Sequence, residues 1–196
     1  MDTTLTYYNS NAEQYIQDTL HVEFSEIQNR FLHKLQLGDR ILDFGCGSGR
    51  DAKYFIEQGF DVDAIDGSAE LCAKAGALLG KAVEHMLFQE LDVSEAYDGI
   101  WACASILHLP KEELKDVLGK MSRALKLNGI IYTSFKYGEF EGYRNGRYFT
   151  YFTEEVWRAF VEEIPQLQIE ELWITGDVRV GRGEERWLNV ILLKCD

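Results

Sequence analysis

The stretch Ile41-Leu42-Asp43-Phe44-Gly45-Cys46-Gly47-Ser48-Gly49 constrains the fold most, because a short apolar run passes directly into three glycines at alternate positions. The apolar run is typical of a buried β-strand, and Ala52, Phe55 and Ile56 follow the glycines at helical spacing. A glycine loop between a strand and a helix lets the backbone approach a ligand closely, and the first N–H groups of the helix are free to bind it. The sequence therefore predicts a nucleoside or nucleotide site in an α/β fold.

Apolar runs alternate with amphipathic stretches from residue 40 onward, which is the pattern of a mainly parallel sheet with crossover helices. Strands are predicted at 40–44, 60–65, 85–91, 99–104, 130–135, 167–174 and 187–193. Helices are predicted at 11–18, 24–35, 50–58, after Ser68, from Pro110 to Asn128-Gly129, and at 154–163. The last two strands should be antiparallel and close one edge of the sheet.

Size and charge narrow the class of protein. With 196 residues, 46% of them hydrophobic and 27% charged, the chain should form a single domain over residues 1–196. A net charge of −13 makes nucleic acid an unfavourable partner, because binding to a phosphate backbone depends on Lys and Arg. No apolar stretch is long enough for a membrane helix, and the N-terminus lacks the pattern of a signal peptide, so we expect a cytoplasmic protein that binds no membrane. The four cysteines show no metal-ligand spacing, so no metal site is expected.

Two aspartates and an arginine narrow the ligand further. The fingerprint of nicotinamide dinucleotide sites requires a glycine where Arg50 stands, which disfavours such a cofactor. Asp43, inside the motif, could accept from the α-ammonium of a methionine moiety, directly or through water. Asp66 ends the second predicted strand and suits a carboxylate that accepts both ribose hydroxyls. In the alternative interpretation both aspartates only cap helices.

The chain resembles the class I S-adenosylmethionine-dependent methyltransferases, in particular the small-molecule and tellurite-resistance-type group, over nearly its whole length from Tyr7. Four segments carry the resemblance: residues 41–49, 62–68, 97–108 and 123–129. The resemblance implies a Rossmann-like three-layer sandwich with a seven-stranded, mainly parallel sheet and an antiparallel last strand. It implies S-adenosylmethionine as the cofactor and S-adenosylhomocysteine as its product.

The resemblance also implies which residues hold this cofactor. The glycines would cradle the methionine part and the ribose, a carboxylate near residues 88–92 would accept from the adenine amine, and the end of the fourth strand would lie under the sulfonium. Asp92 is the first choice for the adenine carboxylate and Glu90 the second. The expected cofactor-binding residues are Asp43, Gly45, Cys46, Gly47, Gly49, Arg50, Asp66, Gly67, Leu91, Asp92, Ala102 and Cys103.

Methyl transfer from a sulfonium is an in-line displacement, so the protein mainly supplies orientation, exclusion of water and sometimes a base for the acceptor. His108 follows the fourth predicted strand and is a candidate base, with a structural histidine as the alternative. Tyr8 is a second catalytic candidate, within an N-terminal helical lid expected over residues 1–38, and aromatic packing on the sheet is its alternative.

Residues 136–152 are predicted to form an acceptor-recognition insertion, because they interleave aromatic and basic side chains in an otherwise acidic chain. Lys136, Tyr137, Arg144 and Arg147 are the expected acceptor-binding residues, which suggests an acceptor with an anionic group. An exposed hairpin that turns at Asn145-Gly146 is the alternative. The arginines of the late loop are expected to pair as solvated charge with their acidic neighbours, as Arg179, Arg182 and Arg186 with Asp177, Glu184 and Glu185.

The leading hypothesis is methyl transfer from S-adenosylmethionine to a small molecule. Two alternatives stay open: another transferase that uses a related nucleoside ligand on the same fold, and a binder of S-adenosylmethionine without catalytic activity. Motifs do not specify the acceptor, and nothing in the sequence fixes the oligomeric state.

Overall fold

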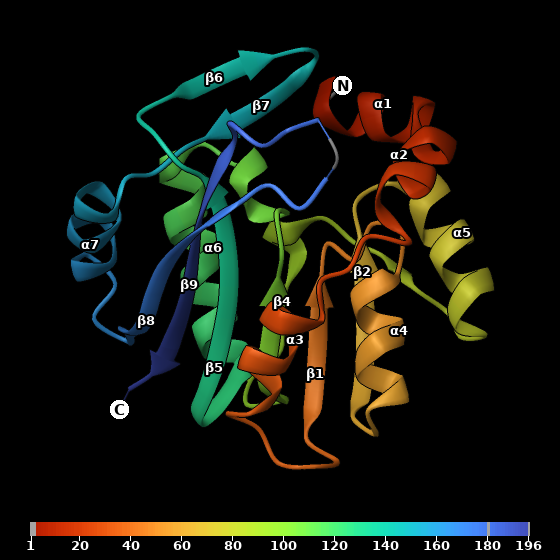
Figure 1. The fold of residues 1–196 in the computed structure, drawn as a ribbon. Coiled ribbons are helices and arrows are strands. Elements are labelled where there is room, and N and C mark those ends of the chain that lie inside the picture. Colours follow the sequence, from red (N-terminus) through yellow and green to blue (C-terminus); the bar gives the residue numbers. More distant parts are fainter. Residues whose placement is uncertain (1–2, 180, 196) are drawn as a thin grey trace.

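The protein is described here by a computed structural model that covers residues 3–179 and 181–195. Its main feature is a seven-stranded sheet in the order β3-β2-β1-β4-β5-β9-β8 (Figure 1). These strands are β1 (Arg40–Phe44), β2 (Asp61–Asp66), β3 (Glu84–His85), β4 (Tyr97–Ala102), β5 (Leu125–Lys136), β8 (Leu167–Gly176) and β9 (Arg186–Lys194). The pairs from β3 to β5 are parallel, whereas β9 runs antiparallel to both β5 and β8. The predicted Rossmann-like sheet with an antiparallel last strand is confirmed.

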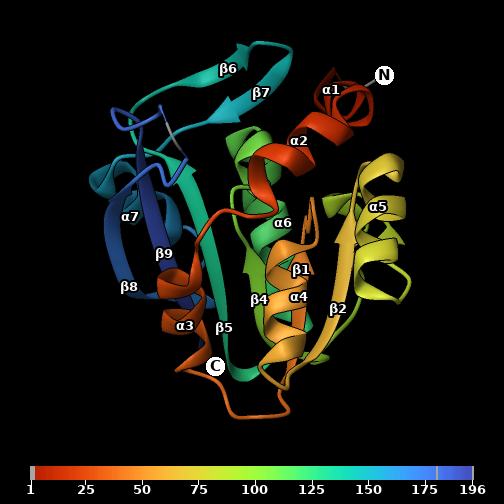
Figure 2. The same cartoon turned by 45° about the vertical axis from the view of Figure 1, so that its right-hand side comes forward.

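Helices cover both faces of this sheet (Figure 2). The helices are α1 (Thr3–Ser10), α2 (Ala12–Thr19), α3 (Ser25–Leu32), α4 (Arg50–Glu57), α5 (Ala69–Leu79), α6 (Lys111–Ala124) and α7 (Glu154–Glu162), with short 3-10 turns η1 (Phe88–Glu90) and η2 (Ile106–His108). Apolar residues of α3, α4 and α5 form one core cluster with Trp101 of β4, and those of α6 and α7 form another with Leu42 and Phe44 of β1. Successive residues of a strand point to opposite faces, so β1 supplies both clusters.

Three predictions about the elements are wrong. The structure has a further helix, α1, ahead of the two that were predicted at the N-terminus. The predicted strand 85–91 shrinks to the two residues of β3, and η1 follows it. Helix α6 ends at Ala124, because Leu125 already has extended backbone and pairs with Tyr97 of β4. Asn128, with a φ of 62°, and Gly129 lie where the register of β5 against β4 shifts, so they form an irregularity within a strand and not a helix end.

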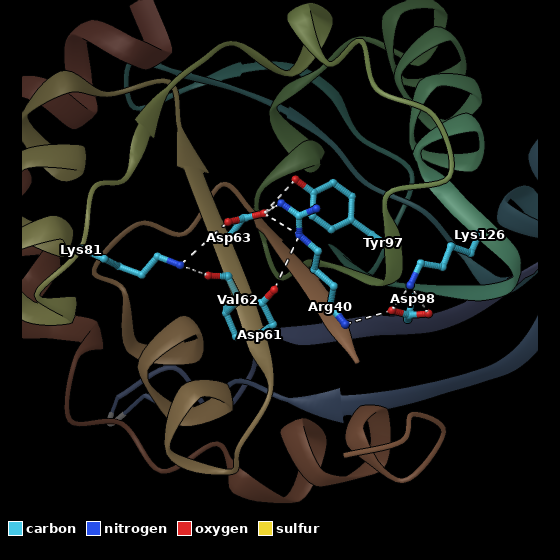
Figure 3. A network of polar contacts seen from close by, with 8 residues as sticks. All are labelled: Arg40, Asp61, Val62, Asp63, Lys81, Tyr97, Asp98 and Lys126. Carbon is cyan, nitrogen blue, oxygen red and sulfur yellow. Dashed lines mark hydrogen bonds and ion pairs between the residues drawn. The ribbon is translucent and has the colours of Figure 1, made fainter. Parts of the chain in front are cut away.

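A network of charged side chains ties the strands together at the end opposite the glycine loop (Figure 3). Nη2 of Arg40 lies 2.7 Å from Oδ2 of Asp63, and the Arg40 N–H donates to Asp98 over 2.9 Å. Lys126 pairs with Asp98 at 2.7 Å, which extends the network from β2 through β1 and β4 to β5. Because these groups are partly exposed, each pair adds little to the stability of the fold. The role of the network at this end of the sheet is structural.

Helices α1 and α2 and the hairpin of β6 (Glu141–Arg144) and β7 (Arg147–Thr150) lie above the carboxyl ends of the parallel strands (Figure 1). The hairpin turns at Asn145-Gly146, where both residues have positive φ. The N–H of Tyr148 donates to Oγ1 of Thr4 over 3.0 Å, and Oγ of Ser68 donates to Oδ1 of Asn9 over 2.7 Å. These bonds fasten α1 to the hairpin and to the start of α5. Across residues 3–179 and 181–195, the helices are all too short or too polar to cross a membrane.

Candidate active site

The glycine loop follows β1 and makes two close approaches that a side chain would block. Gly45 and Gly47 have φ values of 87° and 54°, which favour glycine. A Cβ on Gly45 would lie 2.6 Å from Cβ of Ser105, and one on Gly47 would lie 2.9 Å from the phenol of Tyr15. Gly49 has a packing role, because a Cβ there would lie 3.1 Å from Cβ of Ala75 in α5. The loop is thus a cradle whose floor is backbone.

Asp66, at the end of β2, faces this cradle. Its two carboxylate oxygens accept from the N–H groups of Gly47 and Ser68, each over 2.8 Å. Burial raises the pKa of this carboxyl, and the two N–H donors act in the opposite direction. Ser68 itself caps α5 by accepting from the N–H of Leu71. Asp66 therefore shapes the loop and also lines a cavity beside it.

Asp43 is placed differently. Its side chain is buried, lines neither of the two cavities described below, and accepts the N–H of Ala52 over 3.0 Å, so it caps α4. Burial raises the pKa of the Asp43 carboxyl well above its usual range, and the charge of Asp51 adds to the effect. The capping interpretation describes Asp43 in this structure.

The first cavity, of about 660 Å³, lies between the glycine loop, η1 and α1. Residues that line it include Leu5, Gly67, Leu71, Leu87, Phe88 and Gln89. Most of these side chains are apolar, and the Asp66 carboxylate and the Gln89 amide are among the polar groups, so this slot has the composition of a small-ligand site.

The residues expected to bind adenine do not line this slot. The Asp92 side chain is 88% exposed, 3.9 Å from Arg123, because the chain turns through η1 before it. The Glu90 carboxylate instead accepts the N–H of Leu87 over 2.7 Å, and Leu91 packs in the core. Gln89 is the polar residue of this segment that lines the cavity, and its Nε2 donates to Glu113 over 2.6 Å. The sequence offers Gln89 only as one of several polar residues in this segment, and no motif spacing singles it out.

The second cavity, of about 1340 Å³, lies between the glycine loop, α2, the hairpin and the loop that joins β8 to β9. Cys46, Arg50 and Cys103 line it, as does Lys136 at the end of β5. Ala102, expected under the sulfonium, is fully buried in the core and lines neither cavity. Burial raises the pKa of the Cys103 thiol to about 12, so this thiol stays neutral and is a poor nucleophile.

Two of the four expected acceptor-binding residues line this cavity, Lys136 and Arg147. Arg144 instead points out of the hairpin, where its guanidinium lies 4.7 Å from the Phe140 ring centre. Tyr137 lines neither cavity. Conversely, Arg179 and Arg182 do line it, although the late loop was expected to be solvated. The sequence did not place them there, because α7 and β8 lie between the hairpin and this loop along the chain.

Five residues line both cavities and so mark where these meet: Tyr8, Tyr15, Gly45, Ala104 and His108. At this junction the Tyr8 hydroxyl lies 2.8 Å from Nε2 of His108, and Nδ1 of His108 lies 2.6 Å from the carbonyl oxygen of Tyr148. A carbonyl only accepts, so Nδ1 carries the proton and Nε2 of the neutral ring accepts from Tyr8. Burial raises the pKa of Tyr8, while nearby Arg147 lowers it. The two catalytic candidates therefore form one hydrogen-bonded pair.

Comparisons with known proteins find methyltransferases. Residues 41–129 match a family described as "Methyltransferase domain". The chain is 24% identical over 190 residues to an uncharacterised methyltransferase of Staphylococcus carnosus, covering 92% of this chain and 90% of that protein.

Solved structures resemble the chain in fold. One is the Burkholderia thailandensis 1,6-didemethyltoxoflavin-N1-methyltransferase with its substrate and S-adenosylhomocysteine bound, with a TM-score of 0.78 at 20% identity over 98% of this chain and 85% of that one. Another is an N-methyltransferase of Bradyrhizobium japonicum in complex with S-adenosylhomocysteine, with a TM-score of 0.72 at 13% identity and full coverage of both chains. At this identity the likeness concerns the fold alone.

Proposed function

The chain is an S-adenosylmethionine-dependent methyltransferase, and on that premise we propose that it methylates a small molecule held in the second cavity, at the junction that Tyr8 and His108 line. One observation carries the proposal: two cavities of different character meet at a single set of residues, Tyr8, Tyr15, Gly45, Ala104 and His108. A donor and an acceptor that enter from different sides would come together there.

The residues present fit the cofactor. Gly45 and Gly47 line the first cavity with backbone, and the Asp66 carboxylate lies beside them as an acceptor for ribose hydroxyls. The slot at Leu87, Phe88 and Gln89 suits adenine. Cys46 and Arg50, in the second cavity, are the residues next to which the methionine end would extend, with Arg50 available for its carboxylate.

When bound, S-adenosylmethionine supplies an electrophilic methyl group. The task left to the chain is to orient the acceptor and to remove its proton as the new bond forms. The Tyr8 oxygen would take that proton while the Tyr8 proton passes to Nε2 of His108, and the carbonyl of Tyr148 holds the ring in the required tautomer. The proton thus ends on His108, from which it leaves to solvent.

A small acceptor suits the setting better than a macromolecule. Helices α1 and α2 and the hairpin lie over the site, consistent with the proposed roles of residues 1–38 as a lid and of 136–152 as an acceptor-recognition insertion (Figure 1). The net charge of −13 opposes binding to nucleic acid.

The test has two parts. Calorimetric titration with S-adenosylhomocysteine should show binding to one site per chain. Incubation of the protein with methyl-labelled S-adenosylmethionine and a low-mass fraction of cell extract should yield a labelled small molecule. Binding with no labelled product from any extract would favour a non-catalytic binder, and labelled transfer of a group other than methyl would favour a different transferase.

A further inference from the structure

The second cavity gathers cations that its acidic neighbours do not balance. Its three ion pairs are Arg50–Asp51, Lys136–Glu185 and Arg179–Asp177. Arg147 and Arg182 also line the cavity, as does Asp18, and the ion pairs of the described residues include none of these three. Five cations therefore face four carboxylates, Asp18, Asp51, Asp177 and Glu185, so the cavity keeps an excess of positive charge in a chain whose net charge is −13.

Arg147 shows the clearest sign of an absent partner. Its guanidinium carbon lies 4.3 Å from the ring centre of Tyr7 and 5.1 Å from that of Phe149, so aromatic side chains hold it in place. The guanidinium also interacts with the Tyr8 hydroxyl, whereas its Nε is buried and has no hydrogen-bond partner. A buried donor without an acceptor costs free energy, which a ligand oxygen at this position would recover.

We propose that the methyl acceptor carries a carboxylate or phosphate group that Arg147 binds, with Arg182 as the second cation. This inference rests on the proposed function and specifies its substrate class. A guanidinium binds such oxyanions through two parallel N–H donors, which fixes the orientation of the molecule as well as its position. The guanidinium of Arg147 lies 5.8 Å from the Tyr8 ring centre, so an anion bound there would hold the rest of the acceptor beside the Tyr8–His108 pair.

The bound anionic group positions the acceptor and is not the nucleophile that receives the methyl group. An oxygen that shares its charge with a guanidinium is a weaker nucleophile, and a carboxylate has no proton for the Tyr8–His108 pair to remove. The methyl group therefore goes to a separate O–H or N–H group of the same molecule: the bond from the methyl carbon to sulfur breaks, the bond to oxygen or nitrogen forms, and the proton passes to the pair. The product keeps its negative charge.

Labelled product from the extract tests this directly. We expect it to be retained on an anion exchanger at pH 8, and loss of retention after treatment with phosphatase would identify phosphate as the anionic group in place of carboxylate. At limiting extract concentration, Arg147→Gln and Arg182→Gln should each lower the rate of labelling by about 10- to 100-fold, with unchanged affinity for S-adenosylhomocysteine. Arg144→Gln, in the same hairpin but outside both cavities, should label at the wild-type rate.

A second measurement does not depend on finding the acceptor. Benzoate and phenyl phosphate should raise the melting temperature of the protein saturated with S-adenosylhomocysteine, benzyl alcohol should not, and Arg147→Gln should remove the effect while Arg144→Gln keeps it. A labelled product that is not retained, or anion stabilisation that is absent from the wild type or equal in Arg147→Gln, overturns the inference and leaves methyl transfer standing. Failure to bind S-adenosylhomocysteine at all overturns the proposed function instead.

Discussion

The Tyr8 hydroxyl donates to Nε2 of His108 over 2.8 Å, across 100 residues of sequence and at the point where the two cavities meet. Tyr8→Phe keeps the ring, which packs edge-on against Tyr15, and removes only the hydroxyl. We expect methyl transfer to slow by roughly 10²- to 10⁴-fold, the usual contribution of a positioned proton acceptor. Affinity for S-adenosylhomocysteine should change little. Rates of labelling and calorimetry measure the two quantities separately.

His108→Gln should lower the rate to a similar extent, and the double variant should be little slower than either single variant, because the two groups act as one unit. Tyr143→Phe, at an exposed tyrosine of the hairpin, is the matched control. Additive effects of the two single changes would contradict a shared proton path.

A second prediction concerns the ribose. Asp66→Ala removes the carboxylate that lines the first cavity and holds the N–H groups of Gly47 and Ser68. Binding of S-adenosylhomocysteine should weaken by about 1–3 kcal/mol, the scale of a lost hydrogen bond to a charged group. Asp63→Ala, on the same strand but in the network at its other end, should leave the dissociation constant unchanged. Equal affinity of the wild type and Asp66→Ala would remove Asp66 from the site.

The sequence predicted the fold well and the site in part, and the difference has a physical origin. Strand and helix periodicity is local, so β1, α4, α5 and the antiparallel β9 could be placed within a few residues. The Tyr8–His108 pair could not be predicted as a pair, since a contact between residues 8 and 108 depends on how α1 folds back over the sheet. Arg182 was missed for the same reason, because a distant loop brings it to the hairpin's cavity.

The prediction of the adenine-binding residues was wrong for a local reason, which leads to a third prediction. The apolar run at 85–91 favours a strand, but η1 replaces most of it, so that Gln89 lines the cavity while Asp92 faces solvent. Gln89→Ala should therefore weaken binding of S-adenosylhomocysteine by about 1 kcal/mol, the scale of one hydrogen bond. Asp92→Ala should have no effect. The reverse order of effects would restore the carboxylate predicted from the sequence.

A fourth prediction separates two reasons why a position requires glycine: a positive φ, and the lack of space for a Cβ. Gly45 and Gly80 both have positive φ, but a Cβ would meet Cβ of Ser105 at 2.6 Å in the first case and nothing within 4 Å in the second. Gly80→Ala should cost roughly 1–2 kcal/mol of folding free energy from backbone strain alone. Gly45→Ala should cost about 1–3 kcal/mol more, because Ser105 must shift. Urea denaturation measures both, and equal losses would show that the loop has room for the methyl group.

The buried carboxylate of Asp43 yields a prediction about pH. Its raised pKa means that, above the ordinary value of 3.8, the folded state still binds a proton that the unfolded state has released. This group therefore makes folding less favourable as pH rises from that value toward its pKa in the folded state. Asp43→Asn keeps an acceptor for the Ala52 N–H and removes the titration. The stability of the variant relative to the wild type, from urea denaturation without ligand, should increase between about pH 4 and pH 8.

The slope of this difference with pH is the decisive quantity, because the new amide can add a constant penalty of its own. Asp92→Asn, at an exposed carboxylate, controls for the loss of one charge from an acidic chain. A difference that is flat with pH would mean that Asp43 is ionised in the folded protein at every pH tested, and a difference that falls would mean that the fold stabilises its charge. In the second case the buried carboxylate has a cationic or N–H partner strong enough to offset desolvation, which is the property that the predicted contact with the methionine ammonium would require.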